Sequence, residues 1–210
     1  MSVLINDKID DLLKTTSRSF YPTLKYLPKK VRGQIGLLYL LARVADTIAD
    51  SKSGETDELL RLLRDYNKVA QGKSNNLPNF SKLAEIQDNP HEAELLRNVQ
   101  DVIDGLTVYS EGDKQRMLEC LDIIVGGQIL DLERFGPAKE GGSLSALSNN
   151  SELDDYTFRV AGCVGVFWTK MSLAHLITLS SEKENEFLKE KRMRDLMLQL
   201  FLYFYFLALF

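Results

Sequence analysis

One segment of the chain is apolar on nearly every side of a helix and still carries three charges. It reads LLYLLARVADTIAD and runs from Leu37 to Asp50. Helical spacing places Tyr39, Arg43 and Asp46 on one face, and Asp50 continues that line. The opposite stripe consists of apolar residues with the same spacing, namely Leu37, Leu41, Val44 and Ile48. We therefore predict a helix that is buried against neighbours on most sides and turns a narrow polar line toward an internal cavity.

The rest of the chain has the same helical periodicity, and no run alternates at period two. Apolar spacing in the first residues (Ile5, Ile9, Leu12) predicts one more helix, and a short helical piece lies between Pro22 and Pro28. Longer helices are expected over 30–50, 58–69, 92–106, 114–134 and 153–179. Segments 70–81 and 135–151 are rich in Gly, Asn, Ser or Pro and are expected to be loops. The prediction is a single all-α domain.

Composition excludes several classes of protein. Hydrophobic residues make up 44% of the 210 residues, enough for a real core, and the net charge of -4 argues against a nucleic-acid-binding protein. Cys120 and Cys163 lack the spacing of a zinc site, so we expect two core thiols in a reducing compartment. The N-terminus has early acids and does not resemble a secretory signal. These features predict a cytoplasmic protein.

The two aspartates of the polar line predict a cation site. Carboxylates at i and i+4 repel each other, and they do so more strongly in a low-dielectric cavity. Mg²⁺ commonly uses one or two carboxylates together with substrate phosphates, so Asp46 and Asp50 suit a magnesium–diphosphate site. Arg43 adds a cation for the same phosphates. The alternative is that Arg43 only pairs with Asp46 and that Asp50 only ends the helix.

Three stretches, in this order, resemble the squalene/phytoene synthase family, the head-to-head prenyl transferases. They are SRSFYPTLKYLP (17–28), GLLYLLARVADTIAD (36–50) and LDDYTFRVAGCVGVFW (153–168). The second is similar to the family's first aspartate-rich motif, and the third to its Tyr-x-x-x-Val-Ala-Gly-x-Val-Gly helix. The resemblance implies the all-α isoprenoid synthase fold with a central cavity.

The resemblance also implies roles for residues of the polar line and of the third stretch. Asp46 and Asp50 resemble the Mg²⁺-binding aspartates, and Arg43 resembles the arginine that holds the diphosphate. Tyr39 lies on the same wall. Tyr156 resembles the tyrosine near the carbocation of the first half-reaction, with a core aromatic as the alternative.

Further residues resemble the parts of the family that contact the prenyl chain. Ser17, Ser19 and Phe20 match a segment that contacts the diphosphate and the first isoprene units, although Ser17 alternatively caps the helix that follows. Channel-lining positions of the family correspond to Val160, Ala161 and Gly162. Gly162 and Gly165 allow close approach or serve only helix packing. The segment GGQILDLERFG (126–136) also resembles a family segment, with Asp131 as an extra polar wall residue.

The activity implied by the resemblance is the condensation of two farnesyl diphosphates through a cyclopropyl diphosphate to squalene, with Mg²⁺ and, for squalene, NADPH. Within the family, a phytoene or dehydrosqualene synthase is the alternative. The expected partner is thus a small prenyl diphosphate, on a monomer.

The last part of the chain departs from the family pattern. A second aspartate-rich motif should follow residue 188, but KEKRMRDLMLQLFLYFYFLALF (189–210) contains only Asp195, with no carboxylate three or four residues further on. We therefore divide the chain into a partial synthase-like domain (1–190) and an atypical apolar tail (191–210), and we interpret the fold as incomplete at the C-terminus. Weak or absent turnover is expected from this chain.

The apolar tail leaves a different class of function open. Residues 196–210 carry no charge, but a helix of this length spans only about 22 Å. A bilayer core needs about 20 residues, so a peripheral membrane contact fits better than a span. The alternative to an enzyme is a non-catalytic family member that acts as an interaction scaffold. The intact line of Arg43, Asp46 and Asp50 argues against it.

Overall fold

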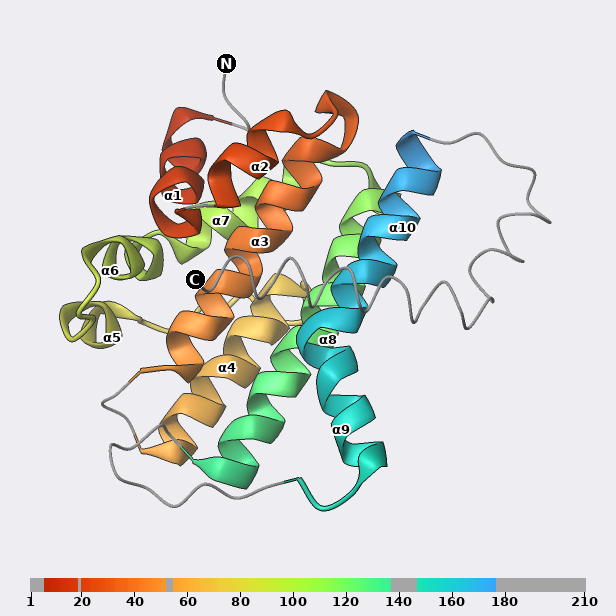
Figure 1. Cartoon of the computed structure of the whole chain (residues 1–210). Helices are drawn as coiled ribbons and strands as arrows, with labels where there is room; N and C mark the ends of the chain where they lie inside the picture. The colour runs from red at the N-terminus through yellow and green to blue at the C-terminus, as the bar shows by residue number, and fades with distance from the viewer. Residues whose placement is uncertain (1–5, 19, 52–54, 137–146, 177–210) are drawn as a thin grey trace.

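The structure, a computed structural model, describes residues 6–18, 20–51, 55–136 and 147–176, and every regular element among them is helical (Figure 1). The elements are α1 (Asp7–Ser17), α2 (Phe20–Tyr26), α3 (Lys29–Ala49), α4 (Thr56–Ala70), α5 (Ser81–Glu85), α6 (Pro90–Arg97), α7 (Val99–Asp104), η1 (Gly105–Val108), α8 (Glu111–Phe135), α9 (Asn150–Thr157), η2 (Phe158–Gly162) and α10 (Cys163–His175). The predicted all-α class is confirmed.

The apolar helix of the sequence, α3, runs through the middle of the molecule and packs against α8, α4 and α1 (Figure 1). The predicted apolar stripe is completely buried, with 0% exposure for each of its four members, Leu37, Leu41, Val44 and Ile48. Leu40 and Ala45 beside the stripe are also at 0% exposure. At about 1.5–3 kcal/mol for each large apolar side chain, burial of this stripe is a main source of stability for the fold.

Side-chain caps fix where several helices begin. Asn6 Oδ1 accepts a hydrogen bond from the backbone N–H of Ile9, 2.9 Å away, at the start of α1. Ser110 Oγ accepts in the same way from Asp113 at the start of α8, at 3.2 Å. Asn149 caps α9 through the N–H of Glu152. Each cap satisfies a donor that the helix leaves free, which typically stabilises a helix by about 1 kcal/mol.

Two of the expected helices are interrupted. The segment 92–106 was expected as one helix but divides into α6, α7 and η1, because the chain leaves helical geometry at Asn98, whose side chain donates to the Glu94 carbonyl 2.7 Å away. In the segment 153–179, α9 and α10 are joined by a π-helical turn, η2. Such turns insert a residue into a helix and are frequent at functional sites.

α10 lies antiparallel along α8. His175 Nε2 is 2.8 Å from Asp113 Oδ1 near the start of α8, and Lys170 Nζ is 2.9 Å from Glu119 Oε2 further along it. The two cysteines, Cys120 on α8 and Cys163 on α10, are 3% and 2% exposed, so the prediction of core thiols is confirmed.

Several predictions concern residues outside the described part. Ser19, the end of the expected 153–179 helix, Asp195 and the apolar tail at 191–210 all belong to this group, and so the division into two regions stays a prediction. Among the described helices, none is both long enough and apolar enough to cross a membrane.

Candidate active site

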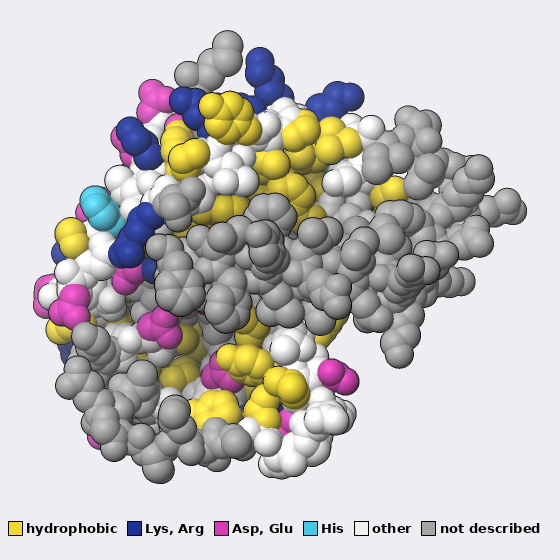
Figure 2. Space-filling model, in the orientation of Figure 1, with side chains coloured by type: hydrophobic (Ala, Val, Ile, Leu, Met, Phe, Trp, Pro, Cys, Tyr) yellow, Lys and Arg dark blue, Asp and Glu magenta, His cyan; other side chains and the backbone are white. Residues whose placement is uncertain are grey.

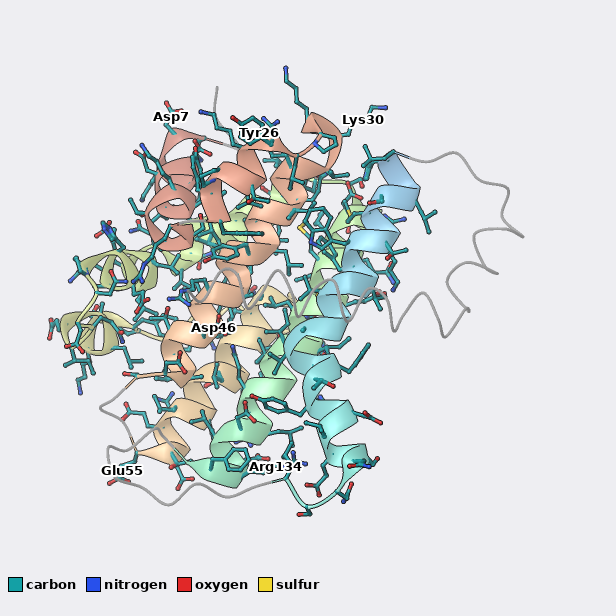
Figure 3. All side chains as sticks on the ribbon, in the orientation of Figure 1. Asp7, Tyr26, Lys30, Asp46, Glu55 and Arg134 are labelled. Atoms are coloured by element: carbon teal, nitrogen blue, oxygen red, sulfur yellow. The ribbon has the colours of Figure 1, made fainter. Side chains whose placement is uncertain are left out.

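The polar line of α3 emerges from the core on one side of the helix. Tyr39, Arg43 and Asp46 are half-buried and Asp50, just after the last turn, is exposed. Asp46 lies near the middle of the molecule in Figure 3, and Gln128 of α8 reaches its carboxylate. The line therefore lies between helices rather than on an ordinary solvated face.

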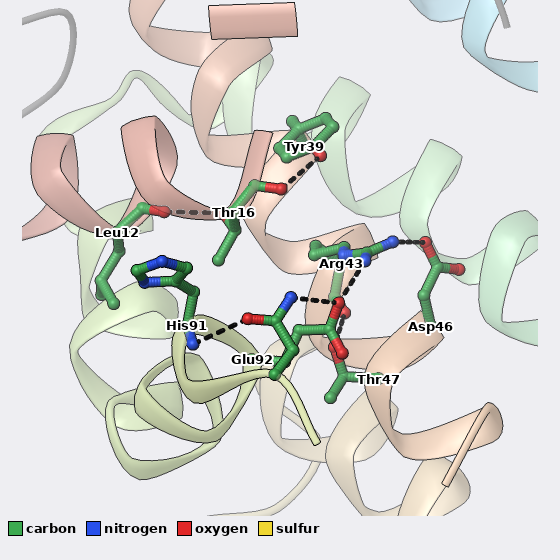
Figure 4. Close-up of polar contacts among 9 residues, drawn as sticks. Leu12, Thr16, Tyr39, Arg43, Asp46, Thr47, His91 and Glu92 are labelled. Carbon is green, nitrogen blue, oxygen red and sulfur yellow. Dashed lines mark hydrogen bonds and ion pairs between the residues drawn. The ribbon is translucent and has the colours of Figure 1, made fainter. Parts of the chain in front are cut away.

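Arg43 is held between two carboxylates (Figure 4). Its Nη2 donates to Glu92 Oε1 on α6 at 2.5 Å, and its Nη1 is 4.0 Å from Asp46 Oδ2. The pair with Asp46 is thus present, as the alternative interpretation expected, but Glu92 is the nearer partner. Arg43 Nε is buried and has no hydrogen-bond partner. One buried donor of the guanidinium is therefore left without an acceptor.

Asp46 is also contacted from α8, because Gln128 Nε2 donates a hydrogen bond to Asp46 Oδ1. Burial, together with the charges of Asp50 and Glu92, raises the pKa of Asp46 to about 6 against the opposing effects of Arg43 and Gln128. A carboxylate with a raised pKa lacks sufficient positive charge nearby. This is the electrostatic condition that a bound cation would relieve.

Asp131 adds a fourth carboxylate, one turn beyond Gln128 on α8. Burial and the charge of Asp50 raise its pKa, against the opposing charge of Arg134. Asp131 Oδ1 and Gln128 Oε1 are both buried without a hydrogen-bond partner. A buried, unpaired acceptor costs free energy unless a donor or a cation satisfies it. Asp131 acts electrostatically on Tyr156 of α9 as well as responding to Asp50 at the end of α3, and its role as a polar wall residue stays a prediction.

Asp50 has a double role. It occupies the C-cap position of α3, and its backbone N–H donates to the Asp46 carbonyl at 2.8 Å. Burial raises its side-chain pKa, and the charge of Glu92 raises it further while Arg43 lowers it. The carboxylate that ends the helix thus belongs to the same electrostatic cluster as Asp46.

The residues of the first family-like stretch lie next to Tyr39. The rings of Phe20 and Tyr39 are 5.5 Å apart and tilted, and Tyr39 Oη donates to the Thr16 carbonyl at 3.3 Å (Figure 4). Ser17 is buried at the end of α1, where its hydroxyl donates to the Leu13 carbonyl at 2.5 Å. The structure thus brings Phe20 to the wall of α3 and directs the Ser17 hydroxyl back into α1.

The residues of the third stretch lie along α9 and η2. Tyr156 is half-buried on α9, and burial followed by the charge of Asp131 raises its pKa. Val160, Ala161 and Gly162 are the last three residues of the π-helical turn, and Ala161 and Gly162 are buried. Gly165, which follows on α10, is buried too. Asp131 thus interacts electrostatically with Tyr156 as well as with Asp50 of the polar line.

The donor set fits Mg²⁺ bound together with a diphosphate. Within the described residues no three Asp, Glu, His or Cys side chains form a group that could hold a metal ion alone. Magnesium commonly binds one or two carboxylates and completes its shell with substrate phosphate and water. Asp46 and Asp50 would supply the carboxylates, and the unpaired oxygens of Gln128 and Asp131 are acceptors that metal-bound water would satisfy.

Sequence reasoning missed Glu92 and Gln128. Asn89 to Glu92 form a helix-capping pattern, in which Asn89 Oδ1 accepts from the N–H of His91 and its Nδ2 donates to Glu92 Oε1. This local role hides the second contact of Glu92, with Arg43. No local signal marks Gln128, which is 82 residues from Asp46 in the sequence.

Two surface hollows lie away from this cluster. One, of about 400 Å³, lies between the end of α4 and the first half of α8, with Gln71, Lys114 and Asp122 on its walls. The other, of about 170 Å³, lies between residues 77–81 and the end of α6. Neither includes a residue of the polar line.

The fold is that of known squalene synthase structures. The complexes of TcSQS with the ligands BPH1237 and E5700 match it with TM-scores of 0.64 and 0.58, over 90% and 88% of this chain. Sequence identity is 19% and 20%, so these similarities concern the fold alone. The predicted helical fold is thereby confirmed.

The chain belongs to the squalene/phytoene synthase family, whose sequence model matches residues 13–196. Squalene synthase of Schizosaccharomyces pombe is 27% identical over 155 residues, which are 74% of this chain and 32% of that protein. The chain spans just under half of the two TcSQS chains, 46% and 49%. The family is one of prenyl transferases known for Mg²⁺-dependent catalysis, which confirms the expected class at this level.

Proposed function

We propose that the cluster on α3 binds the diphosphate of a prenyl substrate through Mg²⁺, and that the protein condenses two farnesyl diphosphates head-to-head toward squalene. The observation that supports this most directly is the buried Nε of Arg43 without a partner, beside two carboxylates of raised pKa. A bound anion would accept a hydrogen bond from Arg43, and a bound cation would neutralise the two carboxylates. Either ion alone would leave the other group without a partner.

Each residue has a part in this proposal. Asp46 and Asp50 hold Mg²⁺, and Gln128 orients Asp46 through its hydrogen bond. Arg43 binds a diphosphate oxygen through the donor that neither carboxylate uses. Bound Mg²⁺ neutralises the diphosphate so that it can leave as an anion. Tyr156 and the buried Ala161 and Gly162 of η2 would face the allylic cation in a dry environment, where an aromatic ring stabilises positive charge.

Ligand binding is the first test. The purified chain is heated with farnesyl thiodiphosphate, a slowly ionising analogue, with and without Mg²⁺. We expect a rise in melting temperature only when both are present, and loss of this rise in Asp46→Asn. The matched control is Asp122→Asn, an exposed carboxylate on α8 that pairs with Asn67. A rise that is independent of Mg²⁺, or that persists in Asp46→Asn, would contradict the proposal.

Product analysis separates squalene formation from the alternative within the family. The protein is incubated with farnesyl diphosphate and Mg²⁺, with and without NADPH. A squalene synthase gives squalene only with NADPH, whereas a dehydrosqualene synthase gives its product without it. The cyclopropyl diphosphate is expected in both cases without NADPH. Dehydrosqualene as the product, with no squalene when NADPH is added, would refute squalene formation and leave the metal–diphosphate site intact.

A further inference from the structure

A second surface, far from the carboxylate cluster, combines positive charge with exposed apolar side chains. It surrounds the corner between α2 and α3, and we call it the basic corner, formed by Lys25, Tyr26, Lys29 and Lys30. All four side chains are exposed, and Tyr26 is 87% exposed, the most of any large hydrophobic residue described. Tyr26 and Lys30 both project from the same edge of the molecule in Figure 3.

The lysines of this corner form no ion pairs with the described residues, whereas Lys8, Lys68, Lys114 and Lys170 all do. The whole chain has a net charge of -4, so this local group of unpaired cations has the opposite sign to the net charge of the protein. Such a group attracts an anionic partner at long range.

The backbone of the corner is held in place. Arg32 donates from Nε and Nη2 to the Leu27 carbonyl, at 3.0 and 2.5 Å. Leu24 on α2 is fully buried, which fixes the helix from which Lys25 and Tyr26 project. The exposed tyrosine is therefore presented outward by the fold.

Two more exposed apolar residues lie at this end of the molecule. The first is Val108, which is 59% exposed. Its neighbour in the sequence, Tyr109, lies against Gly33 of α3, where an added Cβ would be 2.5 Å from Tyr109 Oη. The second is Leu176, which is 44% exposed and follows His175. His175 and Gln34 of α3 both contact the Asp113 carboxylate, which places the end of α10 beside α3. Figure 2 shows hydrophobic patches next to Lys and Arg side chains along this upper edge.

We propose that the basic corner docks on an anionic lipid surface. Lysines near a membrane are attracted to anionic headgroups and can extend along the interface, and tyrosine is enriched at the boundary between headgroups and acyl chains. An acidic protein would use the lysines but would leave an isolated, outward tyrosine and scattered aliphatic residues without a pocket. The mixture of unpaired cations with Tyr26, Val108 and Leu176 fits a lipid surface better.

The test is sedimentation of the full chain with vesicles of phosphatidylcholine alone or with 30% phosphatidylglycerol added. We expect binding to the anionic vesicles that weakens at 0.5 M salt, where charges are screened within about 4 Å. The variant Lys29→Glu/Lys30→Glu should bind at least about 10-fold more weakly. Tyr26→Ser, which keeps the charge, should bind about fivefold more weakly.

The matched control is Lys73→Glu/Lys82→Glu, which makes the same charge change at two exposed lysines outside the basic corner. It should bind anionic vesicles within about twofold of the parent chain, because attraction is strongest within a Debye length of the surface. All variants keep the C-terminal residues, so any contribution from them is the same in each. The proposal would be overturned if both double variants lost the same affinity for anionic vesicles, or if the parent chain bound neutral and anionic vesicles equally well. It would also be overturned if the parent chain did not bind anionic vesicles. The last result would favour an acidic protein as partner.

Discussion

At the scale of single residues, Asp46 combines binding chemistry with a cost to stability. Its pKa is raised to about 6, mainly by burial, from an ordinary value of 3.8. A group with a raised folded pKa stabilises the fold while it is protonated, below pH 4, and this stabilisation is lost as the pH rises through 6. At neutral pH the free protein therefore carries an unfavourable charge that a bound cation would offset.

Asp46→Asn should accordingly be more stable than the parent chain at pH 7.5 without ligand. We expect a rise in melting temperature on the order of 2 °C, kept small because 42% of the Asp46 side chain is exposed to solvent. The difference should be much smaller at pH 4, where Asp46 is protonated in the folded state. Thermal melts by circular dichroism at the two pH values measure this, and equal melting temperatures at pH 7.5 would contradict it.

The same pKa predicts how binding depends on pH. Mg²⁺ binds the ionised carboxylate, so the Mg²⁺-dependent stabilisation by farnesyl thiodiphosphate should decline as the pH falls through about 6. Melting experiments between pH 5 and pH 8 measure the shift. Asp122→Asn should show the same profile as the parent chain. A shift as large at pH 5 as at pH 8 would mean that Asp46 does not bind the metal.

At the scale of helices, two adjacent glycines of α8 make room for Arg159 of η2. A Cβ at Gly127 would lie 3.0 Å from Arg159 Cβ, close to the backbone of the turn. A Cβ at Gly126 would lie 3.1 Å from Arg159 Nη1, at the end of a flexible side chain. Arg159 Nε donates to Asp155 Oδ2 on α9 at 2.9 Å. The contact of α8 with η2 thus depends on Gly127 more than on Gly126.

Alanine substitutions at these glycines should have opposite effects. Gly127→Ala should destabilise the protein by about 1–2 kcal/mol, because the methyl group would push the turn away from α8. Gly126→Ala should be neutral or stabilise it by up to about 1 kcal/mol, since alanine favours a helix and Arg159 can move. Urea denaturation measures both values. A greater loss in Gly126→Ala than in Gly127→Ala would refute this description of the contact.

At the scale of the whole molecule, one buried carboxylate joins three long helices. Asp113 of α8 accepts hydrogen bonds from Gln34 of α3 at 3.2 Å and lies 2.8 Å from His175 Nε2 at the end of α10. Burial alone would raise the pKa of Asp113, but the hydrogen bonds from His175 and Gln34 hold it below its usual value. Its stabilising effect is therefore present above pH 4 and is lost as the pH falls through the lowered pKa.

Asp113→Ala should destabilise the protein by about 2–3 kcal/mol, because it leaves partly buried polar groups of α3 and α10 without their partner. Asp122→Asn on the same helix, which keeps an acceptor for Asn67, should change the stability by less than about 0.5 kcal/mol. Urea denaturation at pH 7.5 compares the two. A similar, small effect of both variants would show that Asp113 does not hold the helices together.

The amino-acid sequence alone determined the helices and the polar line of α3. Both follow from the 3.6-residue period, in which local spacing decides which side chains share a face. The motifs around Arg43, Asp46 and Tyr156 also indicated the family, which the match over residues 13–196 confirms. The sequence misjudged 92–106 and the π-helical turn of 158–162, because helical periodicity is nearly unchanged across a short interruption.

Only the tertiary structure decided what surrounds that line. Glu92 reaches Arg43 across 49 residues of sequence, and Gln128 reaches Asp46 across 82. The unpaired atoms of Arg43, Gln128 and Asp131 are likewise a result of packing, since whether a polar group finds a partner depends on every helix around it. The basic corner arises in the same way. Its residues are visible in the sequence, but their exposure and their lack of ion pairs follow from how α2 and α3 meet.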